Sequence, residues 1–141
     1  MLPAMRSLGV LLFVAAQTPA PTLPGCPTDR VVGDIGVNGL DCIDCEIHGA
    51  PRRGASWIQF KTEPGVKDVR GPAVGRLQPG DIIVSIDSLP IASARGSQRY
   101  SRVMPGQTIR FAIRRGTGVT EVTVVAGAMC GGPPSRHVQR I

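Results

Sequence analysis

Hydrophobic and polar residues alternate along short segments in the second half of the chain. Residues 108–114 show this pattern most clearly, with apolar side chains on one face and arginines on the other. The apolar positions are Ile109, Phe111 and Ile113. A period of two over a window of this length predicts a β-strand with one buried face. Residues 119–125 form a second β-branched segment, and the short Gly-rich link at 115–118 predicts a hairpin between the two.

Two further apolar segments, 57–60 and 82–86, also predict strands. In the second of these, strict alternation places three side chains on the buried face: Ile82, Val84 and Ile86. Short helices are predicted at 72–77, which begins with proline, and at 93–103. Glycine and proline together number 31 of 141 residues, so long helices and a helix bundle are excluded. The pattern therefore predicts a mainly β fold, in one domain of antiparallel strands with two small helices.

The first sixteen residues predict an export signal. A short basic start at Arg6 precedes a continuous apolar stretch at 8–16, which is too short to span a membrane as a helix. We expect cleavage after Ala16, then a Pro-rich leader at 17–29, the domain at 30–128 and a flexible tail at 129–141. The expected location is the periplasm or cell envelope, or outside the cell. A lipobox-like segment ending at Cys26 leaves lipoprotein anchoring as an alternative.

The formal charge is +6, from 14 arginines, two lysines and ten acidic residues. Acidic residues concentrate at 29–46, and six arginines lie at 95–115. Clustered arginine can neutralise phosphates, but aromatic residues make up only 4% of the chain, so platforms for base stacking are missing. We expect no nucleic-acid partner. The basic cluster is interpreted as a solvated face.

Residues 77–91 resemble the signature of bacterial PDZ domains, such as those of the high-temperature-requirement serine proteases. The turn Leu77-Gln78-Pro79-Gly80-Asp81 precedes an apolar strand and a second turn that contains Asp87 and Pro90. The segment 105–109 and the hairpin at 114–116 are similar to the family's pattern as well. The resemblance implies a PDZ-like antiparallel β-sandwich of five to six strands capped by two short helices. It also implies a module that binds protein C-termini or extended peptides by strand addition.

In this family the peptide carboxylate lies against a loop of the form any–apolar–Gly–apolar, which matches residues 34–37 here. Its glycine allows backbone amides to converge on the carboxylate, while Asp34 adds a negative charge beside it. An upstream arginine can supply positive charge, and the second helix forms one wall. The peptide-binding residues that the resemblance implies are Arg30, Gly33, Asp34, Ile35, Gly36, Val37, Arg95, Arg99 and Val103.

The two sides of the implied groove differ in charge. Asp41, Asp44 and Glu46 lie on or near the second strand, while arginines at 95, 99 and 102 share one helix face. An apolar last residue with an acidic residue upstream is therefore the expected ligand. The alternative is that these arginines extend into solvent.

The even number of cysteines in an exported chain predicts disulfides, with three pairings open. The candidates are Cys26, Cys42, Cys45 and Cys130. A bond within the Cys-x-x-Cys pair needs a turn, because extended residues three apart lie about 10 Å apart. A bond between the outer pair would close about 100 residues and stabilise the fold by about 4.7 kcal/mol. A zinc site and a redox pair are the alternatives.

No motif for a nucleophile, a bound metal or a cofactor is present, and we predict a protein without catalytic activity. The last residue, Ile141, gives an apolar C-terminus of the type that PDZ domains bind, so self-binding by the tail is one further possibility. The leading prediction is an exported peptide-binding module. Its rivals are a disulfide-braced structural protein of the envelope without an open groove, and a thiol or metal protein centred on the Cys-x-x-Cys pair.

Overall fold

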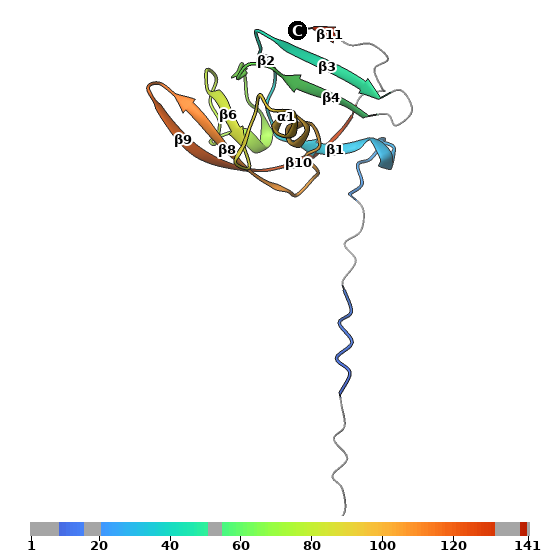
Figure 1. Cartoon of the computed structure of the whole chain (residues 1–141). Helices are drawn as coiled ribbons and strands as arrows, with labels where there is room; N and C mark the ends of the chain where they lie inside the picture. The colour runs from blue at the N-terminus through green and yellow to red at the C-terminus, as the bar shows by residue number, and fades with distance from the viewer. Residues whose placement is uncertain (1–8, 16–20, 51–54, 132–138, 141) are drawn as a thin grey trace, which may run out of the picture.

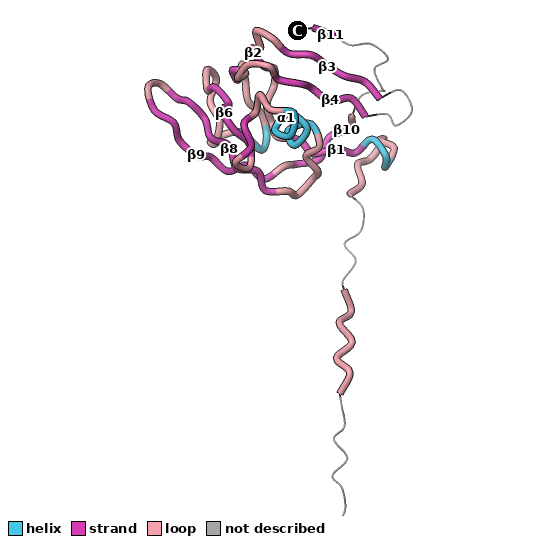
Figure 2. The backbone as a smooth tube through the Cα atoms, in the orientation of Figure 1, coloured by secondary structure: helices cyan, strands magenta, loops and turns pink. Residues whose placement is uncertain are grey.

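The computed structural model describes residues 9–15, 21–50, 55–131 and 139–140 (Figure 1). Strands make up most of its regular structure (Figure 2). The strands are β1 (Val31–Asp34), β2 (Leu40–Asp41), β3 (Cys45–Ala50), β4 (Ala55–Phe60), β5 (Gly65–Val66), β6 (Ile82–Ile86), β7 (Leu89–Pro90), β8 (Thr108–Arg115), β9 (Gly118–Val125), β10 (Gly127–Cys130) and β11 (Gln139–Arg140). The helices are the 3-10 turns η1 (Thr28–Arg30) and η2 (Gly71–Ala73) and the α-helix α1 (Ala94–Ser101).

All of the strand pairs are antiparallel. The largest sheet has the order β2-β5-β6-β8-β9, with β7 paired to β6. A second sheet has the order β11-β3-β4, and β1 pairs with β10. In Figure 1, β4 and β3 lie on one side of α1, and the pair β1–β10 lies on the other. The predicted mainly β, antiparallel fold class is therefore confirmed.

The strand β8 follows its predicted alternation. Ile109, Phe111 and Ile113 are fully buried, and β8 pairs along its length with β9 around the predicted hairpin. The prediction for β6 was wrong in detail, because Ile83 and Ile86 are the fully buried residues. The register against β8 shifts between Ile83 and Ser85. An extra residue at such a bulge reverses which faces the side chains point to.

The helix predicted at 93–103 is present as α1. It begins after Ser93, whose side-chain oxygen accepts the Gly96 amide at 3.0 Å, which is the expected role of an N-cap serine. The helix predicted at 72–77 is only the 3-10 turn η2. Gly75 has φ +77°, a left-handed conformation that ends a right-handed helix.

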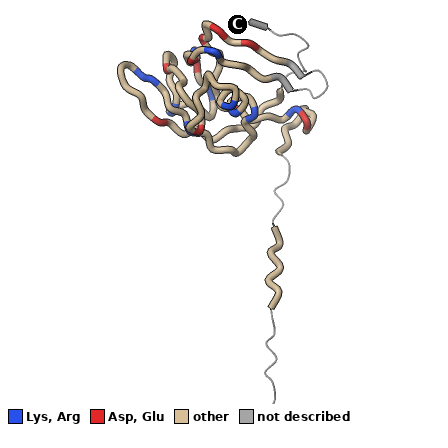
Figure 3. Tube along the Cα trace, viewed as in Figure 1, with Lys and Arg blue, Asp and Glu red and all other residues tan. Residues whose placement is uncertain are grey.

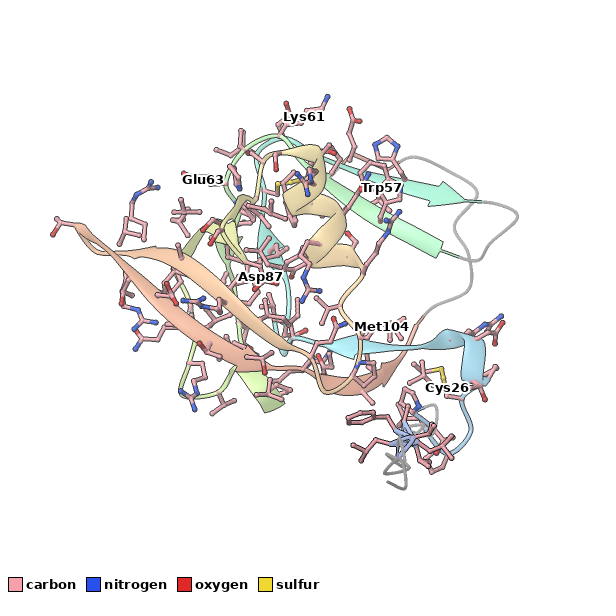
Figure 4. The ribbon with its side chains drawn as sticks, turned by 60° about the horizontal axis from the view of Figure 1, so that its bottom comes forward. Cys26, Trp57, Lys61, Glu63, Asp87 and Met104 are labelled. Carbon is pink, nitrogen blue, oxygen red and sulfur yellow. A yellow bond between two sulfur atoms is a disulfide. The ribbon has the colours of Figure 1, made fainter. Side chains whose placement is uncertain are left out.

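Two disulfides resolve the cysteine pairing that the sequence left open. Cys26 bonds to Cys130, with a Cα–Cα distance of 5.7 Å, and so ties the chain before β1 to the end of β10 (Figure 4). Cys42 bonds to Cys45, with Cα atoms 5.8 Å apart, across a bend between β2 and β3. The turn that this second bond requires is therefore present, and all four cysteines are paired in disulfides.

The predicted boundaries of the leader, domain and tail stay predictions. Residues 1–8, 16–20, 132–138 and 141 lie outside the described residues, so the export signal, its cleavage and the leader stay predictions. The predicted tail begins within β10, and its residues 139–140 form β11, paired with Ile47 and Glu46 of β3. Within the described residues, no helix has the length and apolar character needed to cross a membrane.

Candidate functional site

The loop predicted to hold a carboxylate follows β1 directly. Gly33, within β1, donates its amide to the Val103 carbonyl at 2.8 Å. A Cβ atom at Gly33 would collide with that carbonyl. Val103 is 3% exposed and belongs to the core. The structure thus brings two of the predicted site residues together, where β1 meets the segment that leaves α1.

Gly36 has a conformation that only glycine adopts readily here. Its φ is +87°, and a Cβ atom would collide with the Arg70 carbonyl and crowd the Ala73 amide. The Gly36 carbonyl accepts the Arg70 amide at 2.7 Å. The glycine requirement inferred from the sequence is therefore real, but its visible cause is close packing against the segment around η2.

The Gly36 amide is already bonded within the loop. It donates to Asp34 Oδ1 at 2.9 Å, and the second carboxylate oxygen of Asp34 accepts Arg70 Nη1 at the same distance. Asp34 is 8% exposed, whereas the Arg70 side chain is half exposed. Of the backbone amides of Ile35, Gly36 and Val37 at the implied carboxylate site, the Gly36 amide is thus already bonded to a carboxylate of the protein itself.

The other two amides of this loop are unpaired. Within the described residues, neither Ile35 nor Val37 donates its amide to an acceptor. Val37 forms an antiparallel bridge with Val69, in which Asn38 donates to the Asp68 carbonyl. Because hydrogen-bonding directions alternate along an antiparallel pair, the Val37 amide points away from Val69, toward the opposite edge of its own segment. Two backbone donors therefore remain for a ligand at this edge.

The strand β4 lies along one face of α1. Ser97 Oγ accepts the Phe60 amide at 2.9 Å, and Ser101 Oγ accepts the Ile58 amide at 3.0 Å. Phe60 packs edge-on against Tyr100, with ring centroids 5.2 Å apart. Burial raises the pKa of the Tyr100 phenol. The side of the helix that would form a wall of the implied groove therefore contacts β4 of the β3–β4 pair.

The two serines fix β4 against the helix wall, and the sequence analysis missed them. Ser97 and Ser101 are four residues apart and therefore share one helix face. Two small polar residues at this spacing could have indicated a contact on this helix face, but nothing in the sequence indicated which segment would contact them.

The arginine face of α1 points elsewhere. Arg95, Arg99 and Arg102 do share a face, as predicted, and they line a pocket of about 420 Å³ together with Leu89, Gln98 and Gln107. On a helical wheel this face lies well over a quarter-turn from the serine face. The pocket lining includes none of the acids Asp41, Asp44 and Glu46. The interpretation of two oppositely charged walls facing each other across one groove was therefore wrong.

Two of the three acids in the predicted acidic wall already have basic partners. Asp41 lies 3.6 Å from Lys67 Nζ, and Glu46 lies 2.9 Å from Lys61 Nζ and 3.3 Å from His48 Nε2. Arg30, the predicted distant positive charge, lies exposed in η1 before β1. Figure 3 shows the arginines of α1 in blue and the acids near β2 and β3 in red, on separate parts of the fold.

The comparisons with known proteins agree with the fold. No family model matches the chain. It is 35% identical over 68 residues to the pro-apoptotic serine protease NMA111 of Meyerozyma guilliermondii, which is 48% of this chain and 7% of that protein. A structure of a variant HtrA-type protease AlgW with a decapeptide aligns at TM-score 0.50 and 23% identity, covering 76% of this chain and 31% of that one. The serine endoprotease from Yersinia pestis aligns at TM-score 0.46 and 22% identity, covering 71% and 30%.

The alignment with the AlgW variant defines a class of fold. The chain is a small β domain similar in fold to a part of HtrA-type proteases, and it is compatible with a PDZ-like β-sandwich. It spans less than a third of the length of each of these proteins. The likeness is thus to a piece of a protease.

Proposed function

We propose that this chain is an exported, non-catalytic PDZ-type module that binds extended peptides or protein C-termini by strand addition. The observation that carries the proposal is the pair of unpaired amides at Ile35 and Val37, beside the loop that Gly36 shapes. An extended peptide placed along this edge can offer its carbonyl or carboxylate oxygens to both donors. The AlgW structure contains a decapeptide, and a similar ligand type for this chain is part of the proposal.

The loop chemistry favours one kind of ligand. Asp34 places a negative charge within hydrogen-bond distance of the Gly36 amide, so a terminal carboxylate would meet electrostatic repulsion as well as two donors. A neutral backbone carbonyl of an extended segment would meet the same donors without that repulsion. Among the two ligand types in the proposal, internal extended segments therefore fit the loop better than free C-termini.

A second candidate function rests on the hairpin. The contacts of Ser97 and Ser101 with β4 place native backbone along one face of α1, as expected for a disulfide-braced structural protein of the envelope without an open groove. In that case the unpaired amides would be a local feature of a tight loop.

The test is a titration of the isotope-labelled protein followed by amide NMR. The probe is a pool of decapeptides, randomised at nine positions and ending in valine, prepared with a free carboxylate and with an amidated end. The proposal predicts concentration-dependent shifts at the Ile35, Val37 and Gly39 amides with both pools. Shifts at other amides only would contradict the site, and no shifts with either pool would favour the structural candidate.

A further inference from the structure

The arginine pocket beside α1 is a site that the proposed peptide edge does not use. Its lining consists of Leu89 from β7, four residues of α1 and its C-cap, and Gln107 before β8. These four are Arg95, Gln98 and Arg99 of α1 and its C-cap residue Arg102. A volume of about 420 Å³ is within the range of sites that hold ligands larger than a single ion.

The pocket is held in shape by a fixed arginine. Arg99 donates from Nε to Asp87 Oδ2 at 2.7 Å and from Nη1 to Gln107 Oε1 at 3.1 Å. Asp87, labelled in Figure 4, lies in the turn after β6, and its other oxygen accepts the Arg110 amide at 2.9 Å. Gln107 Oε1 also accepts the Met104 backbone amide, which leaves the side-chain NH2 group of Gln107 as a donor. Two of the five guanidinium donors of Arg99 are used, and three remain.

The free hydrogen-bonding groups of the pocket are donors. Within the described residues, Arg95 and Arg102 form no ion pair, and both are exposed. Asp87 is the one carboxylate of the described residues that forms an ion pair with a lining residue, and its partner is Arg99. Three positive charges against one negative charge leave a net charge of +2 around Leu89. This combination matches a ligand with negative charges beside an apolar group.

We infer that this pocket binds an acidic segment of another protein, with carboxylates on Arg95 and Arg102 and an apolar side chain on Leu89. The two arginines are seven residues apart, or about 10 Å along the helix. Alternate side chains of an extended segment point to the same face about 7 Å apart, within reach of two long, flexible arginines. The site is separate from the Ile35–Val37 edge, so it does not depend on the proposed function.

The experiment measures fluorescence anisotropy of an acetylated, amidated decapeptide that alternates glutamate and leucine. A peptide with glutamine in place of glutamate is the ligand control. The full chain is used with both disulfides formed. Blocked peptide ends exclude recognition of a terminal carboxylate, and any binding at the loop edge does not depend on the pocket arginines. Binding of the acidic peptide that is unchanged when Arg95 and Arg102 are both replaced would overturn this inference and leave the proposed function of the loop untouched.

Arg95→Gln and Arg102→Gln are each expected to weaken binding of the acidic peptide about three- to fivefold, and the double variant by more than tenfold. Arg76→Gln makes the same change of charge at an exposed residue outside the pocket, and it should change binding by less than twofold. Equal weakening by Arg76→Gln would show that net charge alone attracts the peptide and would overturn the inference. So would equal binding of the glutamine peptide.

Two further probes identify a different ligand class. Single-stranded DNA and vesicles containing anionic phospholipid are titrated against the native chain and the double variant. The inference predicts that neither binds more tightly than the acidic peptide. Tighter binding of either probe that is lost in the double variant would assign the pocket to phosphate groups and overturn the assignment to an acidic protein segment.

Discussion

The Asp34 carboxylate accepts the Gly36 amide at 2.9 Å, so the loop that would receive a terminal carboxylate already contains one. Asp34→Asn removes the negative charge with little change in shape. We expect binding of peptides with a free C-terminus to tighten about fivefold, because a like charge at about 4 Å in water costs about 1 kcal/mol. Amidated peptides should gain less than twofold. Anisotropy titrations with both peptide forms measure the difference.

The control for this change is Arg70→Gln. It breaks the same ion pair with Asp34 but leaves the negative charge in the loop. Binding of free C-termini should then weaken or stay unchanged. If both variants tighten binding equally, loosening of the loop and not its charge would be the cause.

Ser97 is fully buried, and its hydroxyl connects α1 to β4 by hydrogen bonds. Its hydroxyl accepts the Phe60 amide and donates to the Ile91 carbonyl, both at 2.9 Å. Ser97→Ala leaves both groups unpaired, and we expect a loss of about 2 kcal/mol in the free energy of unfolding. Urea denaturation measures the loss, and hydrogen exchange at Phe60 should accelerate.

Ser88→Ala is the matched control. Ser88 is exposed in the turn between β6 and β7, and its substitution should change stability by less than about 0.5 kcal/mol. If Ser97→Ala is equally mild, the contact between helix and hairpin is not a major contribution to stability.

Local patterns predicted the elements whose structure is decided locally. The alternation at 108–114 and the Gly-rich link after it specify β8, its buried face and the hairpin. The alternation within β6 predicted the wrong buried face for its first residues, because the bulge between Ile83 and Ser85 depends on pairing with β8. The position of the β3–β4 hairpin depends on Ser97 and Ser101, about 40 residues away. Contacts this distant in sequence leave no periodic signal, and this is why the groove walls were assigned wrongly.

The two disulfides should differ in their contribution to stability. The Cys26–Cys130 bond spans 104 residues, and in the loop-entropy model it stabilises the fold by about 4.7 kcal/mol. The Cys42–Cys45 bond spans three residues and contributes about 2 kcal/mol in the same model. Denaturant unfolding of the paired serine variants Cys26→Ser/Cys130→Ser and Cys42→Ser/Cys45→Ser should show the larger loss for the first. The reverse order would indicate that the short bond acts by holding β3 in the folded state.

Asp81 gives the fold a defined dependence on pH. Its side chain is only 2% exposed. Its carboxylate accepts hydrogen bonds from the backbone amide of Gln78 at 2.7 Å and from both Nε and Nη2 of Arg115 at 2.9 Å. Burial raises the pKa of Asp81, but the hydrogen bonds from Arg115 and Gln78, with the charge of Arg115, outweigh it and hold the pKa below its usual value. The stabilisation is therefore complete above the unfolded-state pKa of about 3.9 and is lost as the pH falls through the folded-state value.

Asp81→Asn should remove this dependence. We expect a loss of about 2 kcal/mol in the free energy of unfolding at pH 7, because charged hydrogen bonds become neutral or are broken. The difference in the free energy of unfolding between Asp81→Asn and the native chain should shrink as the pH falls from 5 to 2. Glu121→Gln, which breaks an exposed pair with Arg110, should cost less than about 0.5 kcal/mol. Urea denaturation at several pH values measures all three chains. If the difference in the free energy of unfolding stays constant down to pH 2, the variant acts through packing and not through titration of this carboxylate.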